Sequence, residues 1–326
     1  MIHLKSGDYE DVESITEGIR SMEIRGAGRI GRYASKALSV IGREYEGDSK
    51  EEFITRLRKG AEDLLSTRPS AISLKNALIL TLKGVEEEDS VEGMKKRLER
   101  RSREFIDNSN KAVKRIARIG SGRIPKGSHV LTHCNSNAAL SVIEKAFEED
   151  KVEGVFCTES RPWRQGHITA RRLAKKGIPV TMIVDSAVRH FIRDMDVVIV
   201  GADTVAANGA VINKIGTSQI ALASHEGRVP FMVAAETYKF SRETLLGSLV
   251  KIEERSADEV ADPLKPEDLP GVDFRNPVFD ATPPEYVDAI ITEIGVVSPY
   301  LATEVIREIF GISGPVRTDR GEFRWL

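Results

Sequence analysis

From about residue 128 onward, short apolar runs alternate with segments of helical periodicity, and this alternation determines the fold class. The predicted strands are rich in Val and Ile and are bounded by Gly or polar residues, at 129–133, 154–158, 179–184, 196–201, 230–235 and 287–292. Predicted helices separate most of them, at 137–148, 166–176, 186–193, 214–224 and 299–309. This pattern predicts an α/β fold with a Rossmann-like, doubly wound parallel sheet that helices cover on both faces.

The first third of the chain has helical periodicity and almost no strand signal. Apolar residues recur at helical spacing among charged ones over 9–20, 29–46, 50–66, 70–83 and 90–119. The stretch 121–127, which contains two glycines and Pro125, is typical of a linker. We therefore expect an N-terminal helical domain over 1–120, a linker over 121–127 and a Rossmann-like domain over 128–326. A Pro-rich segment, 261–284, is expected to form an ordered excursion from the second domain.

Composition and charge argue against several classes of protein. The 326 residues carry 48 basic and 50 acidic side chains, so the net charge of -2 gives no reason to expect nucleic acid as a partner. Two cysteines are too few for a disulfide framework or a zinc site and fit a reducing cytosol. No apolar stretch is long enough for a membrane span, and residues 1–6 lack the apolar core of a signal peptide. We expect a cytoplasmic protein without membrane contact, metal or cofactor.

Two tripeptides, Thr132-His133-Cys134 and Gly201-Ala202-Asp203, each come at the end of a predicted strand. Ligands of open α/β sheets bind just beyond the carboxyl ends of the strands, so a thiol and a carboxylate are expected there as a proton-transfer pair. A helix is predicted to start shortly after Cys134, and a helix N-terminus lowers the pKa of a nearby thiol. Taken alone, a cysteine is more often a buried core residue, which is how we interpret Cys157. His133 alternates to the other face of the strand and is expected to be structural.

Cationic and amide side chains accompany other strand ends. Arg161 and Gln165 follow the strand predicted at 154–158, and Asn213 and Lys214 precede an apolar helix, where free backbone N–H groups and a cation coincide. Three strand ends thus direct chemically active side chains toward one edge of the sheet. This convergence indicates a site for a small anionic molecule, although Asp203 by itself is equally explained as a cap or turn residue.

The segment Gly26-Ala27-Gly28-Arg29-Ile30-Gly31 matches the dinucleotide pattern G-x-G-x-x-G. That fingerprint requires a strand before it, and here the neighbours are helical, so we interpret the match as false. The alternatives are a site for another phosphate at the helix start, flanked by Arg25 and Arg29, and a tight connection between helices.

Farther along, the basic stretch 95–118 is interrupted by acidic residues, so a solvated face or a subunit interface is favoured over a nucleic-acid groove.

Together these motifs resemble, over nearly the whole chain, the superfamily of methylthioribose-1-phosphate isomerase, archaeal ribose-1,5-bisphosphate isomerase and the alpha, beta and delta subunits of initiation factor 2B. The segments that carry the resemblance are 25–28, 66–70, 132–135, 159–166 and 201–217. Both isomerases use a Cys and an Asp at the positions of Cys134 and Asp203, whereas the factor subunits are non-catalytic, so the pair favours an enzyme. The resemblance implies a helical N-terminal domain, a Rossmann-like C-terminal domain and a homo-oligomer built from dimers, with hexamers in the ribose-bisphosphate branch.

Smaller features distinguish the members of this superfamily. The loops at 25–29 and 136–139 differ from those typical of the methylthioribose enzyme, and the segment 234–240 resembles the ribose-bisphosphate enzyme. Arg29 and Lys239 are additional cations that a second phosphate would need. The resemblance therefore implies an aldose–ketose isomerase that converts ribose 1,5-bisphosphate to ribulose 1,5-bisphosphate. The alternatives are a methylthioribose-1-phosphate isomerase and a non-catalytic regulatory subunit.

The same resemblance implies roles for individual residues. Asp203 is expected to protonate the ring oxygen, which requires a raised pKa in a water-poor site, and the Cys134 thiolate is expected to act as base at C2; the reverse assignment stays open. The nucleotide-salvage context of the family suggests AMP as an activator. The expected substrate contacts, which include cations for a sugar bisphosphate, are Arg25, Gly26, Ala27, Gly28, Arg29, Arg68, Asn135, Arg161, Gln165, Asn213, Lys214 and Lys239.

Overall fold

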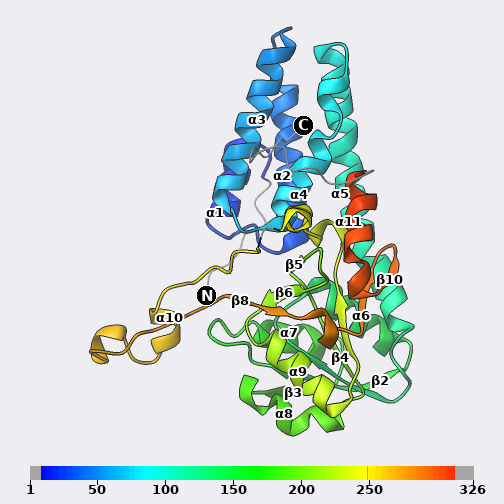
Figure 1. Cartoon of the computed structure of the whole chain (residues 1–326), viewed down its shortest axis with the longest axis vertical. Helices are drawn as coiled ribbons and strands as arrows, with labels where there is room; N and C mark the ends of the chain where they lie inside the picture. Colours follow the sequence, from blue (N-terminus) through cyan, green and yellow to red (C-terminus); the bar gives the residue numbers. More distant parts are fainter. Residues whose placement is uncertain (1–8, 248, 313–326) are drawn as a thin grey trace. The chain divides into compact units, whose positions relative to one another are not determined.

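The structure, a computed structural model, describes residues 9–247 and 249–312 of the 326-residue chain. Its backbone contacts form two compact units, the first ending at Lys111 and the second beginning at Ala112 (Figure 1). The boundary lies inside a long helix, α5 (Val91–Ser121), which ends where the predicted linker 121–127 begins. Residues 1–6, in which no signal peptide is expected, and the last part of the expected second domain lie outside the described residues.

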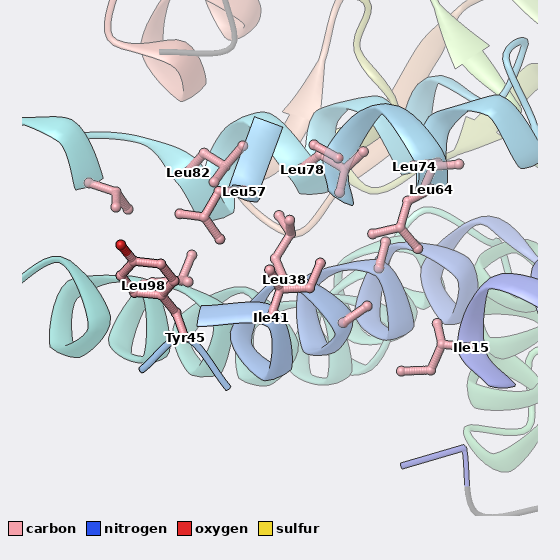
Figure 2. Close-up of a cluster of buried hydrophobic side chains, with 14 of the residues drawn as sticks. Ile15, Leu38, Ile41, Tyr45, Leu57, Leu64, Leu74, Leu78, Leu82 and Leu98 are labelled. Atoms are coloured by element: carbon pink, nitrogen blue, oxygen red, sulfur yellow. The ribbon is translucent and has the colours of Figure 1, made fainter. Parts of the chain in front are cut away.

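The first unit is helical, as predicted. It contains α1 (Val12–Arg20), α2 (Ala27–Arg43), α3 (Lys50–Thr67), α4 (Ile72–Leu82) and the first part of α5, with a short 3-10 helix at Val85–Glu87. The helices α1, α2, α3 and α5 have an apolar face at the predicted spacing, whereas α4 is buried on nearly all sides, and the apolar side chains meet in one core. Figure 2 shows this core, with side chains labelled from α1 to α5: Ile15, Leu38, Ile41, Tyr45, Leu57, Leu64, Leu74, Leu78, Leu82 and Leu98.

Some basic side chains of α5 pair with acidic residues of the same helix. Lys96 pairs with Glu92 at 3.3 Å, and Arg103 pairs with Glu99 at 2.7 Å, one turn apart on the helix. The Lys96 side chain is 74% exposed. Lys111, Lys114, Arg115 and Arg118, farther along the same helix, are also exposed, which supports the predicted solvated face.

The second unit is built on a seven-stranded sheet with the order β10-β9-β7-β4-β1-β2-β3. All predicted strands are present and pair in parallel, which confirms the predicted doubly wound sheet. The strands are β1 (Ser128–Thr132), β2 (Val152–Thr158), β3 (Val180–Ile183), β4 (Val197–Val200), β7 (Phe231–Ala234) and β9 (Ala289–Thr292). The sequence did not indicate β10 (Gly295–Val297), which adds an antiparallel edge next to β9.

Helices connect the parallel strands, and their contacts define two layers. The connecting helices are α6 (Asn137–Glu148), α7 (Gly166–Ala174), α8 (Val188–Phe191) and α9 (Thr217–Gly227), and α11 (Ala302–Phe310) follows the last strand. In the first layer α6 contacts α7, and in the second α8 contacts α9. Right-handed crossovers place these two pairs on opposite faces of the sheet. Small and β-branched side chains of α6 fill the core against β1, β2 and β4.

A second, antiparallel sheet of three strands lies beside the site region and was not predicted. Its order is β5 (Thr204–Val205), β6 (Val211–Lys214) and β8 (Phe279–Thr282). The helix predicted to start at 214 therefore starts at Thr217, because Lys214 is the last residue of β6. The Pro-rich segment is an ordered excursion, as expected, and it supplies β8; a short helix, α10 (Asp258–Ala261), lies at its beginning (Figure 1).

The connectivity of the large sheet fixes where a ligand would bind. From β1 the chain proceeds through β2 to β3 on one side, and through β4, β7 and β9 on the other. The strand order thus reverses between β1 and β4, and ligands of such sheets bind beyond the carboxyl ends of the strands at this reversal. Cys134 follows β1 and Asp203 follows β4, so both residues lie at the reversal.

Candidate active site

Cys134 lies in the turn between β1 and α6 with a left-handed backbone. Its φ angle is 65°, which is uncommon for a residue other than glycine. Its N–H donates a hydrogen bond to Ser160 Oγ at 2.8 Å, and its carbonyl accepts one from Thr169 Oγ1 at 2.6 Å. Both backbone groups of Cys134 are therefore held by side chains that come from the β2–α7 segment.

The prediction that the helix start lowers the pKa of Cys134 is wrong for this structure. Burial raises the pKa of the Cys134 thiol to about 11, and the charge of Asp203 raises it as well, whereas Lys214 and the N–H of Asn135 lower it. The helix effect is small because α6 begins only at Asn137, and the field of a helix terminus falls off within about one turn. Cys134 is thus a protonated thiol at neutral pH in the unliganded chain.

Lys214 is a buried cation at the end of β6. The residue is 6% exposed, and its Nζ lies 5.6 Å from the centre of the Phe279 ring. Burial lowers the pKa of Lys214, while the nearby charges of Cys134 and Asp203 raise it. Within residues 9–312, no carboxylate is recorded in an ion pair with Lys214. A buried ammonium that no carboxylate contacts directly is costly, so this position is suited to an anionic ligand.

Asp203 is exposed in the described chain, so the expected water-poor surroundings are not formed around it. Its N–H donates to the carbonyl of Ile212 at 2.9 Å, which fixes the start of β5 against β6. Two residues earlier, a Cβ on Gly201 would lie 2.3 Å from Ser136 Oγ. Glycine at this position lets the end of β4 approach the turn after β1, and so brings Asp203 toward Cys134.

The end of β2 presents Arg161 and Gln165, as predicted. The Gln165 Oε1 is buried and has no hydrogen-bond partner among the described residues, which leaves it open to a ligand hydroxyl. The Arg161 guanidinium lies 3.7 Å from a carboxylate oxygen of Asp262 on the excursion. A Cβ on Gly166 would lie 1.8 Å from the Thr158 carbonyl, so glycine is required where α7 starts against β2. Asn135, also predicted to contact the substrate, is exposed in the turn after Cys134.

Two of the N–H groups at the start of α9, where N–H groups and a cation were predicted to coincide, are bound by a carboxylate of the protein. The Oδ2 of Asp280 accepts hydrogen bonds from the N–H groups of Gly216 at 2.8 Å and Ser218 at 3.1 Å. Burial raises the pKa of Asp280 to about 6. The predicted contact Asn213 is buried and donates to Thr217 Oγ1 at 3.0 Å. A carboxylate of the protein itself thus holds two of the N–H groups at the start of α9.

Lys239 follows β7, near the same edge of the sheet, and is already paired. Its Nζ lies 2.8 Å from Glu236, and the two side chains are 8% and 5% exposed. The two opposite charges of this ion pair neutralise each other, so Lys239 is not the additional cation without a partner that the sequence suggested. Its contact with a substrate stays a prediction that requires Glu236 to give way.

The predicted contacts at 25–29 and Arg68 lie in the first unit. A helix, α1, precedes the G-x-G-x-x-G segment instead of a strand, which confirms that the dinucleotide match is false. Gly26, with φ 86°, starts α2, and no side chain of the described chain caps the helix there. Arg25 is exposed, the Arg29 guanidinium lies 5.7 Å from the Tyr33 ring centre, and Arg68 is half-buried at the end of α3. Their contacts with a substrate stay predictions.

Two residues have the structural roles that we predicted. The buried His133 donates from Nε2 to the Ile215 carbonyl at 3.0 Å, and its Nδ1 lies 2.6 Å from Thr158 Oγ1. These bonds tie β1 to β2 and to the turn after β6. Cys157 is buried in β2, and burial raises its pKa to about 11.

No group of three or more His, Cys, Asp and Glu side chains in the described ranges is arranged to hold a metal ion.

Sequence reasoning did not identify three residues around Cys134. Ser160 and Thr169 hold its backbone, and the Asp185 carboxylate accepts hydrogen bonds from the N–H groups of Ser160 and Arg161, each at 2.8 Å. Asp185 follows β3 as Cys134 follows β1, so its position at a strand end was a signal that could have found it. Thr169 lies inside α7, where a single threonine has no distinguishing pattern.

Comparison with known proteins shows relatives over most of the chain. The model of the initiation factor 2 subunit family matches residues 23–299. A protein from Archaeoglobus fulgidus named ribose 1,5-bisphosphate isomerase is 54% identical over 94% of this chain and 95% of its own length. A protein of the same name from Methanocaldococcus jannaschii is 49% identical over 94% and 98%. A methylthioribose-1-phosphate isomerase from Geobacter metallireducens is 39% identical over 89% and 88%.

Solved structures share the fold. The 5-methylthioribose 1-phosphate isomerase of Pyrococcus horikoshii superimposes with a TM-score of 0.74 and 31% identity, over 92% of this chain and 88% of that one. The translation initiation factor eIF-2B of the same organism superimposes with a TM-score of 0.73 and 32% identity, over 88% of this chain and 97% of that one.

Across the described ranges, none of the helices combines the length and the apolar character that crossing a membrane requires. The chain belongs to the initiation factor 2 subunit family, and it is an isomerase.

Proposed function

We propose that this isomerase converts ribose 1,5-bisphosphate to ribulose 1,5-bisphosphate, with Cys134 and Asp203 as its acid–base pair. Two relatives with 49% and 54% identity carry this substrate in their names. The observation that carries the proposal is the buried Lys214, which has no ion pair within the described part of the chain and whose charge acts on both Cys134 and Asp203. A phosphate beside an acid–base pair is what the isomerisation of a sugar phosphate requires.

The substrate determines which proton transfers are needed. C1 of ribose 1,5-bisphosphate is bonded to both the ring oxygen and a phosphate oxygen, so opening the ring cannot release a free aldehyde. A base removes the C2 proton while a C1–C2 double bond forms, the bond from C1 to the ring oxygen breaks, and an acid protonates that oxygen. The enol hydroxyl at C2 then returns a proton to the acid, C2 becomes a carbonyl, and the base delivers its proton to C1.

The acid–base pair needs one proton at the start of this sequence. In the unliganded chain that proton is on Cys134, because the pKa of the thiol is about 11. We assign the reactive arrangement to the form with the proton on Asp203, which leaves a thiolate at C2 and an acid at the ring oxygen. A bound substrate covers the exposed Asp203 and disfavours its carboxylate, while Lys214 stabilises the thiolate. In the reverse assignment, Cys134 protonates the ring oxygen and Asp203 takes the C2 proton.

The two phosphates carry about four negative charges near neutral pH, so several cations are needed besides Lys214. We assign Arg161 and the 25–29 turn to them, together with Arg68, and we assign Gln165 and Asn135 to the sugar hydroxyls. The unpartnered Gln165 Oε1 supports the assignment of this residue to a sugar hydroxyl.

The same proposal includes activation by AMP, a place in nucleotide salvage, a cytoplasmic location and assembly as a homo-oligomer. All four rest on the family resemblance.

The decisive test is to incubate the purified protein with ribose 1,5-bisphosphate and, separately, with methylthioribose 1-phosphate, and to follow ketose formation by NMR. Turnover of the bisphosphate alone supports the proposal. Turnover of the methylthio sugar alone replaces it with the second candidate, which the relative with 39% identity favours. If neither sugar is turned over, both substrate assignments fail.

A further inference from the structure

Two neighbouring turns at the strand ends carry non-glycine residues with left-handed backbones, and a hydrogen bond joins them. Cys134 after β1 has φ 65°, and Ser160 after β2 has φ 60°. The N–H of Cys134 donates to Ser160 Oγ at 2.8 Å. Such conformations persist only where the surroundings hold them, so the bond from Cys134 to Ser160 is part of what keeps the cysteine in place.

The turn that carries Ser160 is itself anchored to a third strand end. Asp185, which follows β3, accepts a hydrogen bond from the Ser160 N–H at Oδ1 and one from the Arg161 N–H at Oδ2, both at 2.8 Å. One carboxylate therefore fixes two consecutive N–H groups of the turn. A continuous path of hydrogen bonds leads from Asp185 through Ser160 to the backbone of Cys134, across β3, β2 and β1.

Water cannot readily replace the Ser160 hydroxyl in this path, because Ser160 is 1% exposed. Its Oγ lies 3.3 Å from both Thr158 Oγ1 and His133 Nδ1, which are also buried. Burial lowers the pKa of His133, so this imidazole stays neutral and adds no charge to the cluster. Without the hydroxyl, the N–H of Cys134 would be left unpaired in an enclosed site.

We propose that Ser160 and Asp185 are positioning residues for the isomerase: through the backbone they hold the Cys134 sulfur within reach of Lys214 and Asp203. This inference rests on the proposed role of Cys134 in catalysis. Neither residue is assigned a contact with the substrate. A displacement of about 1 Å at a reacting group costs on the order of 10²-fold in rate, so the two residues should affect turnover more than binding.

The test compares S160A and S160G with the wild type. Both variants lack the hydroxyl, but glycine adopts the left-handed backbone without strain, so an effect shared by the two belongs to the hydroxyl. We expect each to lower kcat roughly 10–100-fold while KM stays within about threefold. D185N should lower kcat less, because its remaining amide oxygen still accepts one N–H. S141A is the control, since Ser141 lies on α6 and its hydroxyl bonds only to Arg172 among the contacts recorded for the described chain.

A second readout does not depend on turnover. Iodoacetamide labelling is followed by mass spectrometry at each cysteine, and the buried Cys157 serves as an internal control. We expect S160A and S160G to be labelled at Cys134 about tenfold faster than the wild type at pH 8, because the released thiol is less enclosed and ionises more readily. Cys157 should remain protected in both variants.

Two results would overturn the inference. One is wild-type kcat together with an unchanged labelling rate at Cys134 in both Ser160 variants. The other is faster labelling of Cys157 to the same degree as Cys134, which indicates general loosening and a merely structural Ser160. If the wild type turns over neither sugar, the proposed function fails on its own, while the labelling still shows whether Ser160 holds Cys134.

Discussion

At the scale of single residues, the charges around Cys134 depend on tertiary contacts that the sequence does not display. The sequence placed Cys134 and Asp203 at adjacent strand ends, and the sheet order agrees. Its local pattern also suggested a low pKa for the thiol, yet burial outweighs the start of α6 and raises the pKa to about 11. The pairing of Lys239 with Glu236 was equally hidden, because the sequence does not show that the fold buries both side chains together.

The positive charge of Lys214 lowers the pKa of the Cys134 thiol. We expect K214M to raise the pKa of the thiol further and therefore to slow iodoacetamide labelling of Cys134 at pH 9 by about threefold or more. Wild-type labelling should keep increasing up to at least pH 9. The matched control is K175M, at the exposed end of α7. Equal or faster labelling of Cys134 in K214M would contradict the assigned electrostatics.

At the scale of elements, periodicity predicted the long helices and the parallel strands, but it did not predict the small sheet β5-β6-β8. β5 has only two residues, and β6 ends in Asn213 and Lys214, so neither has the apolar alternation of a strand. The strand β8, which pairs with β6, is more than 60 residues away in the chain. Long-range pairing of short polar segments is decided by the rest of the fold, and no local pattern announces it.

Two glycines set the approach of helices and strands at the site, and their replacement should destabilise the protein. A Cβ at position 166 meets the backbone carbonyl of Thr158 at 1.8 Å, and a Cβ at 201 meets Ser136 Oγ at 2.3 Å. We expect G166A to cost about 3 kcal/mol of unfolding free energy and G201A about 1–3 kcal/mol, since a backbone carbonyl gives way less than a side chain. Urea unfolding measures both. G93A, where the nearest atoms belong to flexible side chains, should be close to neutral, and equal losses in all three variants would refute this explanation.

Asp280 at the start of α9 predicts a pH dependence of stability. Burial raises its pKa from 3.8 to about 6, so the folded chain holds this proton more tightly than the unfolded chain does. The wild type therefore loses stability as pH rises from about 4 to about 6, by roughly 2–3 kcal/mol at most, and less where water screens the charge. D280N keeps an oxygen for the two N–H groups and cannot ionise.

The measurement for Asp280 is urea unfolding of D280N and the wild type at pH 4, 5, 6 and 7. The stability of D280N relative to the wild type should increase across this range and level off above about pH 7. D273N, at an exposed position on the excursion, is the control and should show no such trend. A constant difference between D280N and the wild type would mean that Asp280 does not titrate in this range.

At the scale of the whole molecule, the residues assigned to the substrate come from distant parts of the chain. The second unit contributes the acid–base pair with Lys214, and the resemblance assigns Arg25, Arg29 and Arg68 of the first unit to the substrate phosphates. Sequence motifs located these cations, since loops before helices are recognisable from Gly and Pro. The sequence alone does not predict which of these cations would bind a phosphate, because their arrangement depends on long-range packing.

Arg68 provides the direct test of the first unit's contribution. We expect R68A to raise KM for ribose 1,5-bisphosphate roughly 10–100-fold with little change in kcat, because a charge-assisted contact to a phosphate is lost. Steady-state kinetics measures both constants. R56A, which removes an exposed arginine of the same helix, should leave KM unchanged. If R68A behaved like R56A, Arg68 would have no part in binding the substrate.

Acid–base isomerisation by Cys134 and Asp203 can be followed by NMR of the reaction with ribose 1,5-bisphosphate, in the wild type and in variants of the two residues. We expect the wild type to form ribulose 1,5-bisphosphate, and C134S and D203N each to be slower by about 10²–10⁴-fold with unchanged melting temperatures. C157A should retain most of the activity, because Cys157 is a core residue. Near wild-type turnover in C134S and D203N would contradict the account.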